Sequence, residues 1–142
     1  MRAGAYTHGA RTLMNFDNFF AINSALEVEL TGSVGAEAAG KRYIGAIGGQ
    51  LDFHRAGLMS ANGRAIIALG STAGKARAPR IVHKLSGPVT GARADADTVV
   101  TEHGIADLKG LTIAERAEAL IAIADPEHRD DLRATVDREG LV

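Results

Sequence analysis

The sequence predicts an α/β fold, a layered sheet with flanking helices. Three observations lead to this prediction. Short apolar segments of strand type occupy most of the chain, helical spacing of apolar residues dominates its last third, and 46% of the 142 residues are hydrophobic. A chain of this size can bury the core of one compact domain, so we expect residues 1–142 to form a single domain.

The strands are expected mainly before residue 102. Residues 19–30 are apolar and then alternate, which predicts a half-buried strand ended by a turn at Thr31-Gly32-Ser33. The apolar run 43–47 is expected to be a short strand that enters the Gly48-Gly49 pair. Further strands are expected at residues 64–69, 81–82 and 98–101, the first of them after an Asn62-Gly63 turn.

Three helices are expected. Residues 51–59 form a short one. A second follows a capping box of Thr112 and Glu115, with apolar residues recurring at helical spacing up to Ala124. Asp125-Pro126 ends that helix and begins the third, with Asp125 as N-cap and Pro126 in the first helical position. The order of the strands within the sheet does not follow from these patterns.

Composition excludes several classes of function. The net charge of −1 and the aromatic content of 4% argue against a nucleic-acid binder. The absence of cysteine removes disulfides, thiolate catalysis and cysteine-ligated zinc, and the five histidines have no metal-ligand spacing, so we expect no metal site. No apolar run reaches the roughly 20 residues of a membrane helix and no secretory signal is visible, so we expect a cytoplasmic protein without membrane contact.

The glycine pair Gly48-Gly49 stands between a predicted strand and a predicted helix. Paired glycines let backbone amides approach an anion or a carbonyl oxygen, and the helix dipole favours negative charge at the same point. An oxyanion or phosphate cradle is one interpretation. A tight turn that only needs a positive φ is the other. The pattern lacks the spacing of the dinucleotide-binding fingerprint.

The segment 70–77 resembles a phosphate-binding P-loop without matching it. Three residues instead of four separate its glycines, and Ala76 stands where a magnesium-binding hydroxyl is needed. The loop nevertheless gathers hydroxyl and cationic side chains, which suits either phosphate binding or a solvated basic loop. These side chains are Ser71, Thr72, Lys75, Arg77 and Arg80.

Glu102 and His103 follow the predicted strand 98–101. Ligands in α/β proteins bind at strand ends, so Glu102 could act as acid, base or substrate positioner, and His103 could do the same. The alternative is a capping or surface carboxylate.

The order of these motifs resembles the C-terminal domain of the acetyl-CoA hydrolase/transferase family over about residues 6–132. Each motif alone is modest, but six in the same order are specific. They are Ala21-Ile22-Asn23-Ser24-Ala25-Leu26-Glu27-Val28-Glu29-Leu30-Thr31-Gly32, Ile47-Gly48-Gly49-Gln50-Leu51-Asp52-Phe53, Ala65-Ile66-Ile67-Ala68-Leu69, Ser71-Thr72-Ala73, Arg80-Ile81-Val82 and Val99-Val100-Thr101-Glu102-His103-Gly104-Ile105-Ala106-Asp107-Leu108-Lys109-Gly110.

The resemblance implies a CoA-transferase or acetyl-CoA hydrolase. CoA would pass between a short-chain acyl-CoA and a carboxylate or water through a glutamyl-CoA thioester. It implies that the amide of Gly49 faces the oxyanion and that Glu102 lies at the active site, while Asp52 and Phe53 would shape the glycine turn. Gly48 and Asp52 would also bind substrate, together with Ser71, Thr72, Lys75 and Arg77 of the loop that would face CoA, which is a substrate and not a cofactor.

The nucleophilic glutamate of that family lies upstream of the matched motifs. The resemblance therefore implies a C-terminal half that works with an N-terminal half, or the product of a truncated or split gene. A domain separated from its partner exposes apolar surface, so we expect at least a homodimer. The alternatives are a non-catalytic CoA- or nucleotide-binding module and a structural remnant without ligand.

Overall fold

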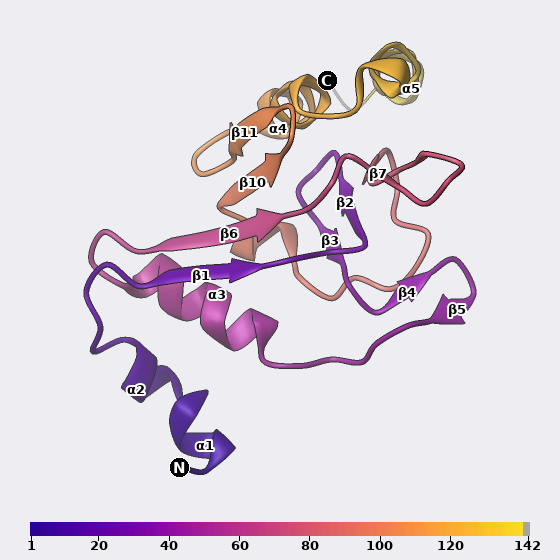
Figure 1. Ribbon diagram of the computed structural model, residues 1–142. Coiled ribbons are helices and arrows are strands. Elements are labelled where there is room, and N and C mark those ends of the chain that lie inside the picture. The colour runs from indigo at the N-terminus through magenta and orange to yellow at the C-terminus, as the bar shows by residue number, and fades with distance from the viewer. Residues whose placement is uncertain (141–142) are drawn as a thin grey trace.

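The computed structural model describes residues 1–140 and is built around a four-stranded sheet in the order β1-β6-β10-β11 (Figure 1). The first three strands are parallel and β11 is antiparallel to β10. Their bounds are Phe20–Asn23 for β1, Arg64–Ala68 for β6, Thr98–Thr101 for β10 and Gly104–Asp107 for β11. The expected fold class, a sheet flanked by helices, is confirmed.

Helices pack on this sheet at two places. The helix α3 (Gln50–Met59) contacts β1 and β6, and α4 (Ile113–Ala122) contacts β11. The last helix, α5 (Arg129–Glu139), packs on α4 after the 3₁₀ turn η2 (Pro126–His128). The remaining helical elements are α1 (Gly4–Thr7), α2 (Ala10–Leu13) and the 3₁₀ turn η1 (Arg93–Asp95).

Within the described residues, short strands form three smaller sheets. A three-stranded sheet has the order β3-β2-β9, and two hairpins pair β4 with β5 and β7 with β8. Their bounds are Glu27–Glu29 for β2, Val34–Gly35 for β3, Ala38–Ala39 for β4, Arg42–Tyr43 for β5, Thr72–Ala73 for β7, Ala78–Pro79 for β8 and Ile81–Val82 for β9.

One apolar core joins the central sheet, the three-stranded sheet and the last two helices. Ile67 and Val99 of the central sheet, Val28 of β2 and Leu120 of α4 all belong to this cluster of buried side chains. Burying each such side chain contributes about 1.5–3 kcal/mol relative to leaving it in water. The core therefore holds the strand ends that follow Ala68 and Thr101 in fixed positions.

The single strand expected over residues 19–30 is wrong, because the chain there forms two strands in two sheets. The guanidinium of Arg80 explains the break, since it donates to the carbonyl oxygens of Ala25 and Leu26. Those carbonyls therefore bond to a side chain instead of a neighbouring strand. The expected alternation survives in β2, where Val28 is buried between two half-buried glutamates.

The strand expected over residues 43–47 is also wrong. Only Arg42–Tyr43 is strand, and the carbonyl of Glu37 accepts the amides of both Ile44 (2.8 Å) and Gly45 (3.0 Å). Because the Glu37 carbonyl accepts both amides, the regular pairing between β4 and β5 ends at this point. Residues 44–48 continue as exposed, irregular chain.

The other expected elements are confirmed with small changes of bounds. The helix expected at 51–59 is α3, and the expected strands are β6, β9 and β10. The capping box is present, and Asp125 caps η2 by accepting the amide of Glu127 at 3.0 Å. Among residues 1–140, no helix is both long and apolar enough to span a membrane.

We predict that Thr112→Ala lowers the free energy of unfolding by about 0.5–2 kcal/mol, because it removes the acceptor for the Glu115 amide at the start of α4. Urea denaturation followed by circular dichroism measures this. Thr135→Ala is the control, since that hydroxyl bonds only within α5. Equal midpoints for the two variants would contradict the role of the cap.

Candidate functional site

Three segments reach the carboxyl edge of the parallel strands. Gly70 and Ser71 follow β6, and Glu102 and His103 follow β10. The helix α3 connects β1 to β6, which are parallel neighbours, so its N-terminus with Gly49 is expected at the same edge. Ligands bind at this edge in α/β proteins.

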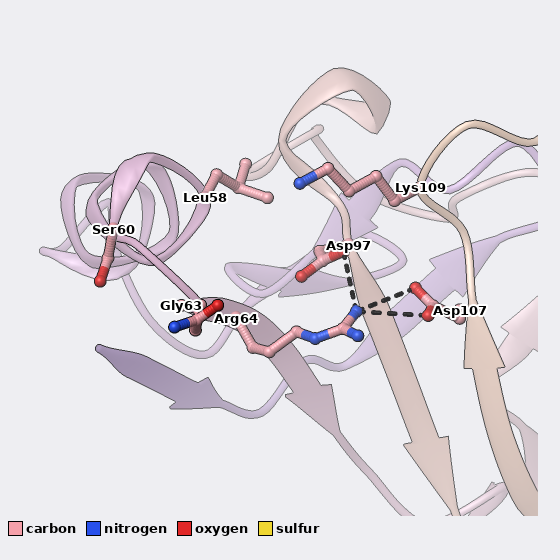
Figure 2. Close-up of a pocket in the computed structure, with 8 residues that line it drawn as sticks. Leu58, Ser60, Gly63, Arg64, Asp97, Asp107 and Lys109 are labelled. Atoms are coloured by element: carbon pink, nitrogen blue, oxygen red, sulfur yellow. Dashed lines mark hydrogen bonds and ion pairs between the residues drawn. The ribbon is translucent and has the colours of Figure 1, made fainter. Parts of the chain in front are cut away.

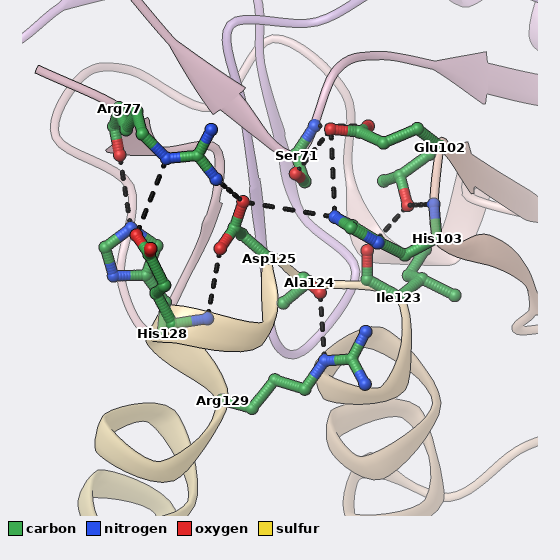
Figure 3. A network of polar contacts seen from close by, with 11 residues as sticks. Ser71, Arg77, Glu102, His103, Ile123, Ala124, Asp125, His128 and Arg129 are labelled. Carbon is green, nitrogen blue, oxygen red and sulfur yellow. Dashed lines mark hydrogen bonds and ion pairs between the residues drawn. The ribbon is translucent and has the colours of Figure 1, made fainter.

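Glu102 is held by Ser71 through two hydrogen bonds. The Ser71 amide donates to Oε2 at 2.8 Å, and the Ser71 hydroxyl donates to Oε1 at 2.7 Å (Figure 3). Ser71 is buried, whereas half of the Glu102 side chain (52%) is exposed. The carboxylate is therefore fixed from one side and open to a ligand on the other.

These contacts keep Glu102 ionised. The Ser71 hydroxyl, the amide of Glu102 itself and the Ser71 amide lower the pKa of Glu102 to about 2. At neutral pH this carboxylate accepts hydrogen bonds and has no proton to donate. Of the three roles expected for Glu102, acid, base and substrate positioner, the low pKa favours the substrate positioner, because such a carboxylate neither donates nor readily accepts a proton at neutral pH.

His103 links Glu102 to a buried carboxylate, Asp125. Its Nε2 lies 3.8 Å from Oε1 of Glu102 and 3.9 Å from Oδ2 of Asp125. The His103 amide donates to the Thr101 hydroxyl at 3.1 Å, and that hydroxyl donates to the carbonyl of Ile123 at 2.6 Å. These bonds tie the end of β10 to the turn after α4.

Arg77 joins the same network from the β7–β8 hairpin. Its guanidinium pairs with Asp125 and lies 3.5 Å from Glu127, while its carbonyl oxygen lies 3.1 Å from Nε2 of His128 (Figure 3). Arg77 has a φ of 51°, a left-handed conformation that a non-glycine residue adopts at a cost. The pairing with Asp125 and Glu127 offsets that cost and fixes the hairpin against the helical turn η2.

The structure thus brings three expected site residues into one network: Ser71, Arg77 and Glu102. Thr72 is half-buried in β7, and Lys75 lies in the exposed turn between β7 and β8. Gly48, Gly49 and Asp52 lie outside the network, at the start of α3. Asp52 is exposed in the first turn of that helix, where a negative charge suits the helix dipole.

The glycine pair differs from expectation in its backbone. The expected tight turn after a strand is wrong, because residues 44–48 are irregular and Gly49 has an ordinary φ of −78°. A Cβ on Gly49 would lie only 2.4 Å from Cδ2 of His8, so close packing explains the glycine. Gly48 is exposed, with open space where a Cβ would stand.

Asp125 is the residue of the network that sequence reasoning missed. Its N-cap role was expected from the sequence. Its second role, pairing with Arg77 and His103, was not expected, because these residues lie far from Asp125 in the chain. Nothing in the local pattern distinguishes a buried capping carboxylate from an exposed one.

A second polar feature lies at the opposite, amino edge of the sheet. A cavity of about 480 Å³ is lined there by the end of α3 and the loop after it, Arg64 of β6, Asp97 just before β10, and Asp107 and Lys109 at the end of β11 (Figure 2). Arg64 lies 3.6 Å from Asp97 and 3.2 Å from Asp107, so its charge is already neutralised. Within the described part of the chain, no group of three or more potential metal ligands gathers at either edge.

The fold and the site define an α/β domain whose sheet carries a fixed carboxylate at its ligand-binding edge. The particular family follows from comparison. Residues 1–136 match the family described as acetyl-CoA hydrolase/transferase C-terminal domain, and the chain belongs to that family. The resemblance inferred from the six motifs is confirmed.

Individual relatives agree with this assignment. The 4-hydroxybutyrate coenzyme A transferase of Clostridium kluyveri is 45% identical over 129 residues, which cover 89% of this chain and 30% of that protein. The structure of RipA from Yersinia pestis superposes with a TM-score of 0.90 at 39% identity, covering 96% of this chain and 31% of RipA. A 4-hydroxybutyrate CoA-transferase from Porphyromonas gingivalis gives 0.78 at 38% identity, covering 94% of this chain and 30% of that one. The chain thus spans about 30% of the length of its curated relatives.

We predict that Ser71→Ala raises the pKa of Glu102 from about 2 toward 4.5, because it removes the strongest donor to the carboxylate. A carboxyl whose pKa is lowered by folding stabilises the fold above its unfolded pKa. Wild type therefore loses this contribution as pH falls from about 4.5 to 2, and Ser71→Ala loses less of it over the same window.

Carbon-detected NMR titration of Glu102 measures the pKa directly. Ser86→Ala is the matched control, since Ser86 binds Glu27 with the same pair of amide and hydroxyl bonds, both 2.7 Å. A Glu102 titration that is identical in wild type and Ser71→Ala would refute the assignment.

Proposed function

We propose that this chain is the C-terminal domain of a CoA-transferase or acetyl-CoA hydrolase, acting as a single domain over residues 1–142. It transfers CoA between a short-chain acyl-CoA and a carboxylate or water. The observation that carries the proposal is the ionised Glu102, fixed by Ser71 at the carboxyl edge of the sheet in a chain of this family. The relatives are named as CoA-transferases, which supports CoA transfer as the class of reaction.

The proposed chemistry divides between two parts of a longer protein. A glutamate of the N-terminal half attacks the acyl-CoA carbonyl, and the CoA thiolate leaves as a mixed anhydride forms. The thiolate then attacks the glutamyl carbonyl of the anhydride, which releases the acyl carboxylate and leaves a glutamyl-CoA thioester. An acceptor carboxylate repeats these steps in reverse, or water hydrolyses the thioester.

Glu102 positions substrate in this scheme. Since it stays ionised at neutral pH, it accepts hydrogen bonds from donors such as the amides of the CoA arm. The Gly49 amide, at the positive end of the α3 dipole, would stabilise the oxyanion of the thioester under attack. Gly48, which has no side chain, would leave room for the thioester to approach the Gly49 amide, and Asp52 would shape the first turn of α3.

The β7–β8 hairpin would face CoA. Arg77 is paired with Asp125 and Glu127, so its charge is committed to the fold. Lys75, at the exposed turn, is the better cation for a phosphate, with Ser71 and Thr72 at the base of the hairpin. CoA is the substrate here, and the proposal needs no cofactor.

The proposed partners are the N-terminal half, a CoA thioester and a short-chain carboxylate, in a cytoplasmic homo-oligomer. Neither nucleic acid nor membrane is part of the proposal. A non-catalytic CoA- or nucleotide-binding module is less favoured, because the family match and the transferase relatives point to an enzyme.

A chimera tests the function. This chain replaces the aligned 30% of the Clostridium kluyveri relative, and turnover is measured with an acyl-CoA and acetate. We expect the chimera to turn over and the chain alone to be inactive. Glu102→Gln should lower kcat while CoA still binds, and Glu118→Gln on α4 is the control. Full activity of Glu102→Gln, or turnover by the isolated chain, would contradict the proposal.

The role of Gly49 needs a test that separates chemistry from packing. We predict that Gly49→Ala in the chimera destabilises the protein because its Cβ meets the His8 ring, and that adding His8→Ala restores stability. Only proline removes the amide hydrogen, and its fixed φ suits the −78° of Gly49, so if the amide serves the oxyanion, Gly49→Pro with His8→Ala lowers kcat by about 100-fold relative to Gly49→Ala with His8→Ala, as for loss of one such donor.

The single variant His8→Ala controls for the loss of the ring itself, which packs edge-on against Phe53 at 4.9 Å. Equal kcat for Gly49→Pro and Gly49→Ala, each combined with His8→Ala, would make Gly49 a packing glycine and remove it from the mechanism.

A further inference from the structure

In β1, β6 and β11, buried side chains alternate with half-buried or exposed ones, and in β10 only Val100 is not buried. The strand register places the buried apolar side chains on a single face, because partners across a sheet share a face, whereas the buried Thr98 lies on the opposite face beside Ile66 and Asp107. The buried apolar residues are Ala21 on β1, Ala65 and Ile67 on β6, Val99 on β10 and Ala106 on β11.

Both packed helices cover this same face. The helix α3 contacts β1, yet Ile22 on the other face of β1 is 66% exposed. Likewise α4 contacts β11, yet Ile105 on the other face of β11 is 70% exposed. Since a covering helix would bury those isoleucines, α3 and α4 lie on the side of Ala21 and Ala106.

The opposite face, called here the open face, is mainly apolar, with the polar Thr98 between Ile66 and Asp107. Ile22 pairs with Ile66, and Val100 pairs with both Ala68 and Ile105. All of these apolar side chains are half-buried or exposed, and so is Phe20 next to them on β1. The ion pair of Arg64 with Asp107 closes the amino end of the face with charge.

Such a face is unusual for a parallel sheet, which is normally covered by helices on both sides. Contiguous exposed apolar surface marks an interaction site. The edge of the sheet at β1 also indicates an interaction site, because residues 18–26 contain no charged side chain. Edges that face solvent usually carry charges that prevent pairing with another chain.

We propose that the open face is the docking surface for helices from the N-terminal part of the longer protein. This inference rests on the proposed function. The relatives carry more than two thirds of their length outside the matched share, which supplies the occupant. Helices are the expected cover, since a second copy of this chain would stack one largely parallel sheet on another.

The absence of cysteine from the chain allows a direct test. Single variants Ile22→Cys, Val100→Cys and Val89→Cys are made in the chimera with the Clostridium kluyveri relative. Val89 lies outside the sheet and is 58% exposed, close to the exposure of Ile22, so it is the matched control. The rate of thiol labelling is measured folded and in urea, after subtraction of the parent chimera.

The open face is expected to be covered in the chimera. Labelling of Ile22→Cys and Val100→Cys should then be at least 10-fold slower folded than unfolded, with little change for Val89→Cys. Equal rates for Ile22→Cys and Val89→Cys in the folded chimera would overturn the proposal. Protection that disappears when an oligomer is diluted to monomer would assign the face to a second copy, and would also overturn it.

Two further measurements keep the test decisive. In the chain alone, Ile22→Cys should label as fast as Val89→Cys, and protection in a monomeric chain would show that its own residues cover the face. Turnover by the parent chimera separates this inference from the proposed function. Protection of Ile22→Cys without turnover would support docking on the open face and contradict the proposed enzymatic function. Turnover with unprotected Ile22→Cys would support the enzymatic function and contradict docking on the open face.

Discussion

The contact between Ser71 and Glu102 is the constraint on which the site depends. It joins the residues that follow two neighbouring parallel strands, β6 and β10, and it uses both a backbone amide and a hydroxyl. A carboxylate held by these hydrogen bonds keeps its charge and its orientation. The apolar core beneath it, with Ile67 and Val99 side by side, sets the spacing of the two strand ends.

Asp125 extends this constraint to the rest of the ligand-binding edge. It is buried, it caps the turn η2, and it faces both Arg77 and His103. A buried carboxylate is costly unless paired, so these partners are held strongly. The hairpin that carries Lys75 is thereby fixed relative to Glu102, although the two are separate in the sequence.

Local patterns in the sequence predicted the elements with strong periodicity or caps. The Thr112 capping box, the α4 spacing and β6 are of this kind. The errors arose where a distant side chain or carbonyl decided the backbone, as Arg80 does at residues 25–26 and Glu37 does at residues 44–45. For the site, the pattern indicated Glu102 and Ser71 separately. Their contact depends on the strand order β6-β10, which no local signal reveals.

A crystal structure of the chimera with CoA bound tests the central claim most directly. The account predicts that the thiol end of CoA lies at the carboxyl edge of the sheet, with Glu102 accepting a hydrogen bond from the ligand. CoA bound instead in the cavity at the amino edge, beside Arg64 and Asp97, would contradict it.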